Sequence, residues 1–224
     1  IGSMADLDAA TLDDVKTWFR SWYGPNNAVL VLAGDIDVAT AKEKVTRYFG
    51  DIPASATLAD MKTHIPKHAQ DTRETIPDRV PQVRLYRGWP VAEMGTRDAA
   101  LLDLFAQVLG GSAASRFDTR LVHGDKIADQ ASAYQWSSEI SGTFFLVSTV
   151  KEGVDPAKVE KALDEELERL IAEGPTADEL ERAKVAGRAA FVRGIERIGG
   201  FGGKSDVLAS CAVYQGTPDC YKEE

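Results

Sequence analysis

The histidines of this chain that are spaced as metal ligands are His64 and His68. A hydrolytic zinc site of the H-x-x-E-H or H-E-x-x-H type needs two imidazoles one helical turn apart and a carboxylate as general base. Here Lys67 stands where the base would be, and its positive charge would repel the metal ion. Pro66 also disfavours the helix that would align the two rings. We therefore interpret both histidines as solvated linker residues and assign no metal ligand.

A second candidate for chemistry is the glycine-rich segment Gly199–Ser205, which resembles a phosphate-binding P-loop. The G-x-x-x-x-G-K-[ST] pattern requires a glycine five residues before Gly203, but Ile198 occupies that position. A P-loop also follows a buried strand, whereas a helix is predicted before this segment. We predict a flexible break between two helices instead of a nucleotide site.

Nucleophilic and acid–base catalysis find no support in the sequence. It contains no G-x-S-x-G motif, and His123 has no partner in a known motif. The acidic pairs Glu165-Glu166 and Glu173/Glu179 fall on predicted solvated helix faces, where such runs are usually found. No catalytic, metal-binding or substrate-binding residue is therefore assigned.

Composition excludes several classes of function. The 224 residues carry a formal net charge of −9 with no Lys/Arg block, so nucleic-acid phosphates would be repelled. The 44% of hydrophobic and 27% of charged residues are typical of a soluble globular protein. No apolar run approaches the roughly 18–20 residues that span a bilayer. The start, Ile1–Met4, lacks the features of a secretory signal peptide, and we expect the chain to be cut from a longer protein.

The two cysteines, Cys211 and Cys220, are too few for a disulfide scaffold or a structural zinc site. Two free thiols are the expected state. A single bridge between them, in an oxidising compartment, is the alternative.

The first predicted secondary-structure element is centred on six apolar residues, Ala28–Ala33. They lie between turn signals at Gly24–Asn27 and Gly34-Asp35. The run is typical of a strand that is covered on both faces. Thr11 is predicted to cap the helix before it, and Asp37 the helix after it. Since such a strand needs a sheet, we expect its apolar face to be buried by the following domain, by a second copy, or by exchange with a neighbour.

Residues 53–80 are predicted to be a linker, because prolines are concentrated there and no hydrophobic period is sustained. Beyond it, hydrophobic patterns predict strands at 82–89, 127–136 and 142–150 and helices at 98–109, 115–122, 155–172 and 176–197. This order predicts an α+β domain with a mainly antiparallel β-sheet and helices packed on it.

Several segments, taken together in this order, carry the motifs of one known family: Tyr23–Asp35, Tyr48–Pro53, Ser115–Val122 with Ile127-Ala128, and Gly199–Asp206. The first is Tyr-Gly-Pro-Asn-Asn-Ala followed by an apolar run that ends in Gly-Asp, and the third begins with Ser-Arg-Phe. Together they resemble the pitrilysin/insulinase family of zinc metallopeptidases, which includes the mitochondrial processing peptidases.

The resemblance implies a clamshell peptidase built from repeated α+β domains around a closed chamber. The family's zinc is held by an H-x-x-E-H helix and a more distant Glu, and no position of this chain matches them. Residues 1–52 resemble the end of a zinc domain, a truncated α-β-α piece of the same fold. Residues 53–80 are then the linker, and 81–224 a second family domain that is catalytically inactive.

Family members often carry, outside the zinc domain, an Arg with a Tyr seven positions later that hold the substrate backbone. The matching positions here are Val122 and Asp129, so the pair is absent. Arg79 and Tyr86 have this spacing but lie at a linker-to-strand boundary. We interpret the chain as a first-half domain of a longer, two-repeat protein. A permanently inactive subunit is the alternative.

The resemblance therefore predicts a non-catalytic segment of a zinc-dependent metalloendopeptidase, forming part of the wall of a chamber that encloses peptide or protein substrates. Zinc is expected in the parent protein and not in this chain. Expected partners are an upstream zinc domain, a downstream repeat and, through the truncated N-terminal piece, a second copy; neither nucleic acid nor a membrane span is expected. The alternatives are a structural or scaffolding subunit homologous to the peptidases, and a free-standing peptide-binding module. The periplasm is the favoured compartment, and the acidic balance favours basic or neutral peptides.

Overall fold

The computed structural model describes residues 2–56 and 61–222. The chain divides into two compact units: residues 62–190 form one, and residues 1–61 with 191–224 form the other. Among the described residues, no helix is long and apolar enough to cross a membrane. The predicted domain boundaries at residues 52 and 80 stay a prediction.

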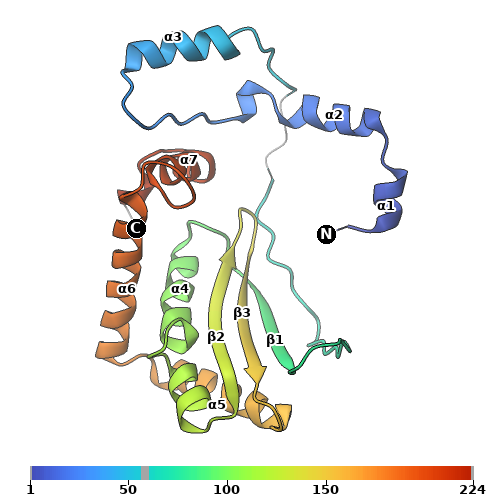
Figure 1. Cartoon of the computed structure of the whole chain (residues 1–224), viewed down its shortest axis with the longest axis vertical. Helices are drawn as coiled ribbons and strands as arrows, with labels where there is room; N and C mark the ends of the chain where they lie inside the picture. The colour runs from blue at the N-terminus through green and yellow to red at the C-terminus, as the bar shows by residue number, and fades with distance from the viewer. Residues whose placement is uncertain (1, 57–60, 223–224) are drawn as a thin grey trace. The chain divides into compact units, whose positions relative to one another are not determined.

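The unit of residues 62–190 is built on a three-stranded antiparallel sheet in the order β1-β3-β2 (Figure 1). The strands are β1 (Arg84–Val91), β2 (Ala128–Ser137) and β3 (Gly142–Val150). β2 and β3 form the predicted hairpin, and β1 pairs with the other side of β3. The α+β fold with an antiparallel sheet is thereby confirmed, and each strand begins and ends within two residues of its predicted bounds.

The helices of this unit are α4 (Arg97–Gly110), η2 (Asp118–Gly124), α5 (Pro156–Glu173) and α6 (Ala177–Ile195), the last of which continues into the other unit. Their starts follow from capping side chains: Thr96 Oγ1 accepts a hydrogen bond from the Ala99 N–H at 3.2 Å. Asp155 caps α5 in the same way. The helix predicted at 115–122 is mostly the π-helical segment η2, whose turns are wider than those of an α-helix.

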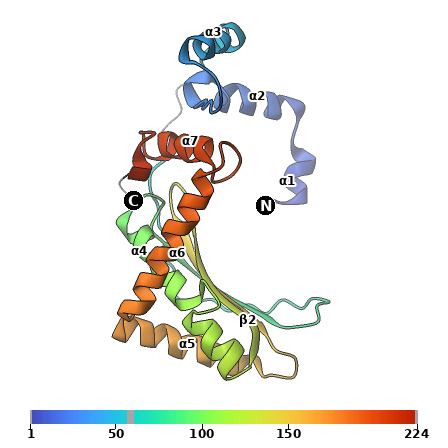
Figure 2. The same cartoon turned by 60° about the vertical axis from the view of Figure 1, so that its left-hand side comes forward.

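Helices α4 and α5 cover one face of the sheet (Figure 2). The burial pattern of β3 identifies the side chains on that face. Its residues alternate between buried and half-buried positions. The buried side chains Phe144, Leu146 and Val150 pack against buried residues of the helical segments: Leu109, Phe117, Leu121, Val159, Leu163 and Leu170. Each fully buried side chain of this size contributes about 1.5–3 kcal/mol to folding, so this cluster is the core of the unit.

The end of α4 approaches the sheet so closely that only glycine fits there. A Cβ atom added at Gly110 would lie 2.3 Å from the backbone nitrogen of Ala133 and 2.7 Å from the carbonyl carbon of Ser132. Both atoms belong to the backbone of β2 and cannot rotate away. Gly110 therefore sets how near α4 lies to this strand.

The N-terminal segment of the other unit contains α1 (Met4–Ala9), α2 (Leu12–Trp22), the 3-10 turn η1 (Pro25–Asn27) and α3 (Val38–Phe49). Both predicted caps are confirmed. Thr11 Oγ1 accepts from the Asp14 N–H at 3.2 Å, and Asp14 Oδ2 accepts from the Thr11 N–H at 2.9 Å, which completes a capping box. Asp37 Oδ1 accepts from the Thr40 N–H at 2.9 Å and begins α3.

The strand expected at Ala28–Ala33 is not formed, and this prediction is wrong for the chain as it stands. These residues have no regular secondary structure, although the backbone is extended at Ala28, with φ −135° and ψ 142°. Val29, Leu30 and Leu32 are 48%, 55% and 49% exposed. Apolar composition yields a strand only where a neighbouring strand accepts its backbone hydrogen bonds, and no strand of the described residues pairs with this stretch. Its expected burial by a partner stays a prediction.

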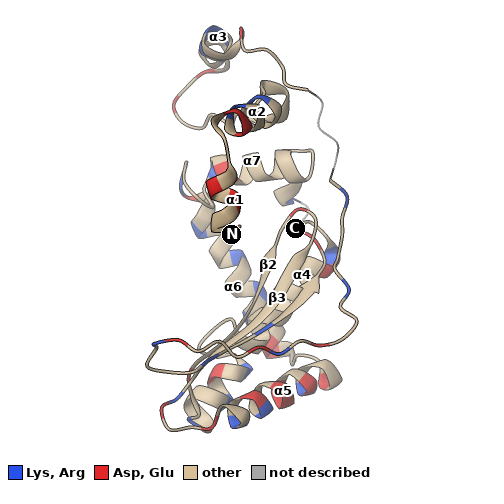
Figure 3. Ribbon diagram, turned by 90° about the vertical axis from the view of Figure 1, so that its right-hand side faces the viewer, with Lys and Arg blue, Asp and Glu red and all other residues tan. Residues whose placement is uncertain are grey.

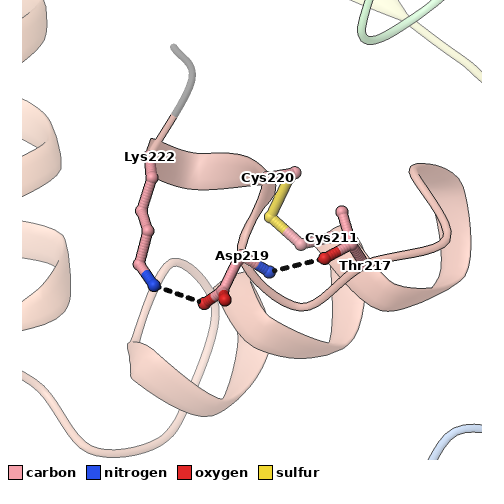
Figure 4. The surroundings of a disulfide bond; sticks show 5 residues. All are labelled: Cys211, Thr217, Asp219, Cys220 and Lys222. Carbon is pink, nitrogen blue, oxygen red and sulfur yellow. Dashed lines mark hydrogen bonds and ion pairs between the residues drawn. A yellow bond between two sulfur atoms is a disulfide. The ribbon is translucent and has the colours of Figure 1, made fainter.

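The C-terminal end of the chain forms α7 (Lys204–Tyr214) and the short turn η3 (Cys220–Lys222). The glycine-rich segment separates α6 from α7, so the predicted break between two helices is confirmed. The expectation of two free thiols is wrong, because Cys211 and Cys220 form a disulfide with their Cα atoms 5.3 Å apart (Figure 4). Spacing alone could not show this, since the turn that returns the chain to α7 depends on Gly216, whose φ is +71°.

Candidate functional site

The face of the sheet opposite the helices is the main candidate for a binding surface. Residues directly opposite one another in an antiparallel pair lie on the same face, so the register around Phe145 defines this surface. We call it the outer sheet face. Its members are Arg84, Tyr86, Gly88 and Pro90 from β1, Gln130, Ser132, Tyr134 and Trp136 from β2, and Thr143, Phe145, Val147 and Thr149 from β3.

Aromatic side chains give the outer sheet face its character. Tyr86, Tyr134 and Trp136 are 63%, 42% and 68% exposed. The rings of Tyr134 and Phe145 stack with centroids 5.3 Å apart, at an interplanar angle of 28°. Opposite Phe145, a Cβ atom added at Gly88 would lie 3.5 Å from its ring, an ordinary van der Waals contact, so the ring lies directly beside β1. The surface therefore presents three exposed aromatic rings, and one of them, Tyr134, is held by stacking on Phe145.

Charge is concentrated away from this surface. Arg84 is the one charged residue among the positions of the outer sheet face, and its Nη1 lies 3.4 Å from the Tyr86 hydroxyl. The strands are almost free of Lys, Arg, Asp and Glu, whereas α5 carries many of them (Figure 3). A sheet face with aromatic rings and a single arginine suits contacts with apolar side chains, and its twelve positions include no carboxylate, histidine or lysine for acid–base chemistry.

The charged groups of α5 and α6 serve as structural ion pairs. Arg116 donates through Nε and Nη2 to the two carboxylate oxygens of Glu179, at 2.8 and 2.9 Å. Nη2 also donates to the Gly174 carbonyl at 3.0 Å, which fixes the turn between α5 and α6. The hydrogen bond from Arg116, with those from Thr176, lowers the pKa of Glu179 to about 2.

The expectation that Glu165-Glu166 and Glu173/Glu179 lie on solvated helix faces is wrong for Glu166 and Glu179, whereas Glu165 and Glu173 are exposed. Glu166 is only 2% exposed, and its carboxylate is paired with Arg120 Nη1 at 3.1 Å and with Arg169. Glu179 is 17% exposed in its side chain. Helical spacing cannot reveal such burial, because the covering arginines come from other segments or from the next turn of the helix.

The chain's own donors do not fit a zinc ion. No group of three or more His, Cys, Asp or Glu side chains that could hold a metal exists within residues 2–56 and 61–222. His64 and His68 are exposed and not in a helix, and the His64 N–H donates to the Ile140 carbonyl at 2.9 Å. Cys211 and Cys220 form a disulfide, so neither offers a thiolate ligand. No step of a reaction is therefore assigned to a metal in this chain.

The positions that match the family's Arg/Tyr pair also lack its chemistry. Val122 lies in η2, and Asp129 is the extra residue at the bulge of β2, where it accepts a hydrogen bond from the Gln82 side chain. Arg79 precedes β1, Tyr86 is on the outer sheet face, and in the described part of the chain no hydrogen bond joins them.

A comparison with known proteins identifies the family to which this chain belongs. The model of a family described as the peptidase M16 inactive domain matches residues 9–186. The chain belongs to this family. Its M16 match begins at the end of α1 and ends within α6, so it takes in α2 and α3 as well as the sheet.

Relatives of this M16 domain are named as proteases. A protein of Helicobacter pylori called zinc protease PqqE is 24% identical over 217 residues, covering 96% of this chain and 48% of that protein. The chain spans about half the length of the curated relatives it matches, at 48%, 44% and 47% of their lengths.

Solved structures share the fold. The peptidase M16 inactive domain from Pseudomonas fluorescens superimposes with a TM-score of 0.82 at 17% identity, covering 99% of this chain and 52% of that one. A chain of complex III2 from Candida albicans superimposes with a TM-score of 0.71 at 14% identity, covering 96% and 52%. At such low identity these likenesses establish the fold alone.

Sequence reasoning missed the outer sheet face, because it assigned no substrate-binding residue. The available signal was the alternation of aromatic residues, with Tyr134 and Trp136 two positions apart in one predicted strand and Phe145 in the next. Without the register between strands, that signal does not show whether the rings meet on one face.

Proposed function

We propose that this M16 inactive domain is the non-catalytic part of a zinc-dependent metallopeptidase and that its outer sheet face forms part of the wall of a chamber enclosing peptides. The family match and the relatives named zinc proteases support the first half of the proposal. The observation that carries the second half is an exposed, aromatic sheet face with a single charged residue, Arg84.

The role of such a wall is to bind and orient a peptide while another domain hydrolyses it. Exposed rings such as Tyr134 and Trp136 offer large contact areas, and an aromatic side chain that packs on such a ring contributes about 0.5–1.5 kcal/mol beyond the area it buries. The net charge of −9 favours basic or neutral peptides over acidic ones. Zinc would be held outside this chain, by the rest of the longer protein, and would supply the activation of the attacking water there.

A first experiment tests the non-catalytic role on this chain alone. Purified protein incubated with zinc and dialysed should contain no stoichiometric metal and should not hydrolyse unfolded peptides. Chelator-sensitive hydrolysis by the chain would contradict the proposal.

A second experiment tests the wall in the longer protein. Replacing both Tyr134 and Trp136 by Ser should raise KM for an apolar peptide about 5- to 30-fold, which corresponds to about 1–2 kcal/mol of lost binding. The value of kcat should stay close to that of the wild type. A matched control is Phe201→Ser, because Phe201 is 93% exposed and lies outside the sheet. Equal KM values for the double variant and the control would refute the chamber-wall role.

A structural subunit without activity is the second candidate, and the fold shared with a chain of complex III2 favours it. The two candidates differ in the region that precedes residue 1 in the gene. An intact H-x-x-E-H there supports the peptidase, and a degraded motif supports the scaffold. Measurable affinity of this chain alone for peptides would favour a free-standing binding module.

A further inference from the structure

The outer sheet face has two ends of different chemistry. The register arranges its twelve positions in rows that cross the three strands, with one residue from each strand in a row. Two neighbouring rows form an aromatic end, which holds Gly88, Phe145, Tyr134, Pro90, Thr143 and Trp136. The other two rows form a polar end, which holds Arg84, Thr149, Gln130, Tyr86, Val147 and Ser132.

The polar end carries a cation without an acidic partner. Strand β1 contains Arg84 and Arg87, which lie on opposite faces of the sheet because side chains alternate along a strand. On the helix-covered face, Arg87 Nη2 donates to Asp164 Oδ2 at 3.2 Å. On the outer sheet face, Arg84 is exposed and makes a long hydrogen bond of 3.4 Å to the Tyr86 hydroxyl. No carboxylate within residues 2–56 and 61–222 forms an ion pair with Arg84, in contrast to Arg87.

The acidic residue next to the polar end, Asp129, has a partner of its own. It lies at the bulge of β2 beside Gln130 and accepts a hydrogen bond from the Gln82 side chain. Gln82 Nε2 also donates to the Val150 carbonyl at 3.3 Å, which holds this side chain in place. The guanidinium group of Arg84 has five N–H donors and no acceptor, and its strongest hydrogen bonds are made to carboxylates. Charge complementarity at the polar end therefore favours an acidic group on a bound molecule.

The distance between the two ends sets the spacing of groups on a bound peptide. Arg84 and Gly88 are four residues apart on β1, which corresponds to about 14 Å of antiparallel strand. An extended peptide has nearly the same rise per residue, and its side chains at positions i and i+4 point to the same side. A peptide that lies along the strands with one side chain over Phe145 therefore brings the side chain four positions away to Arg84.

We propose that the outer sheet face selects extended peptide segments with a large apolar side chain and an acidic side chain four positions apart, and that Arg84 binds the acidic one. This inference rests on the proposed function, since it names the peptides that the chamber wall prefers. The apolar side chain packs on Phe145 and Tyr134, and the carboxylate accepts hydrogen bonds from the Arg84 guanidinium group. The net charge of −9 acts on the total charge of a peptide, whereas Arg84 acts on one position. A neutral or basic peptide with one well-placed Glu satisfies both.

The test measures the binding of fluorescent peptides to the longer protein by anisotropy, with a chelator present so that no peptide is hydrolysed. Both peptide ends are blocked, and each peptide has one Phe with either Glu or Gln four or three positions away, in both chain directions. A spacing of three turns the acidic side chain to the opposite side of an extended peptide. At a spacing of four, in at least one direction, the Glu peptide should bind about 2- to 5-fold more tightly than the Gln peptide, as expected for an exposed ion pair. At a spacing of three the two peptides should bind equally.

Variants of Arg84 assign the preference to this residue. Arg84→Gln should remove the preference for Glu, and Arg84→Glu should reverse it. The matched control is Arg79→Gln, which changes the net charge equally at an exposed position outside the sheet and should keep the preference. A missing preference at a spacing of four, or one that persists in Arg84→Gln, would overturn the inference. A preference that arises only from a free C-terminal carboxylate would also overturn it, because the occupant would then be the end of the peptide.

The double variant of Tyr134 and Trp136 separates this inference from the proposed function. If the double variant loses affinity for apolar peptides and Arg84→Gln binds all peptides as the wild type does, the wall is supported and the selection of an acidic side chain is refuted. If neither variant changes peptide binding, both are refuted.

Discussion

Replacing Gly110 by Ala should destabilise the sheet unit, because the added methyl group has no room. It would lie 2.3 and 2.7 Å from two backbone atoms of β2, against the roughly 3.5–4.0 Å at which carbon atoms normally touch. The helix end would have to move by more than about 1 Å. That displacement would pull Leu109, which is fully buried, out of its position in the core.

The expected size follows from two opposing effects. Alanine in a helix gains about 0.5–1 kcal/mol over glycine, and overpacking a tightly packed contact costs about 1–3 kcal/mol or more. Gly110→Ala should therefore lower the free energy of unfolding by about 1–2 kcal/mol. The matched control is Gly187→Ala in α6, where an added Cβ meets no heavy atom within 4 Å. That variant should gain about 0.5–1 kcal/mol.

Urea unfolding followed by circular dichroism measures both variants. With a typical slope of about 1–3 kcal/mol per molar urea, the midpoint should fall by roughly 0.5–1 M for Gly110→Ala and should rise for Gly187→Ala. Since the chain has two units, amide exchange in α4 and β2 identifies the unit that responds. A Gly110→Ala protein as stable as the wild type would refute the steric argument, whatever the control shows.

Two further predictions concern the ion pair and the disulfide. The pKa of Glu179 is lowered from 4.5 to about 2, so its stabilisation is present above pH 4.5 and is lost as the pH falls towards 2. Glu179→Gln should abolish up to about 3 kcal/mol of this pH dependence, and parallel thermal-melting profiles of the variant and the wild type between pH 5 and 2 would contradict the prediction. Cys220→Ser should destabilise α7 by about 2–3 kcal/mol through the lost closure of a short loop, seen as faster amide exchange in α7. Unchanged amide exchange in α7 would contradict this prediction.

The helices could be predicted from the sequence because their starts are encoded locally. Thr11, Asp37 and Asp155 each begin a helix by accepting a hydrogen bond from an N–H two or three residues further on. Such a contact needs no information from elsewhere in the chain. The α+β order and the hairpin followed in the same way from alternation in neighbouring segments.

Features that depend on distant residues could not be predicted. The burial of Glu166 requires Arg120, which lies on η2, and the need for glycine at residue 110 requires the backbone of β2. The outer sheet face depends on the register between three strands, which no single strand contains. The resemblance to a family supplied the fold and the absence of a zinc motif, but it names no residue of this face.

The stretch Ala28–Ala33 has the composition of a strand but does not form one in the structure. Its residues favour a strand as strongly as those of β3 do, yet only β3 is one, because β3 has strands on both sides. A strand's hydrogen bonds are made by its neighbours, so an apolar run can specify a strand and still lack a sheet.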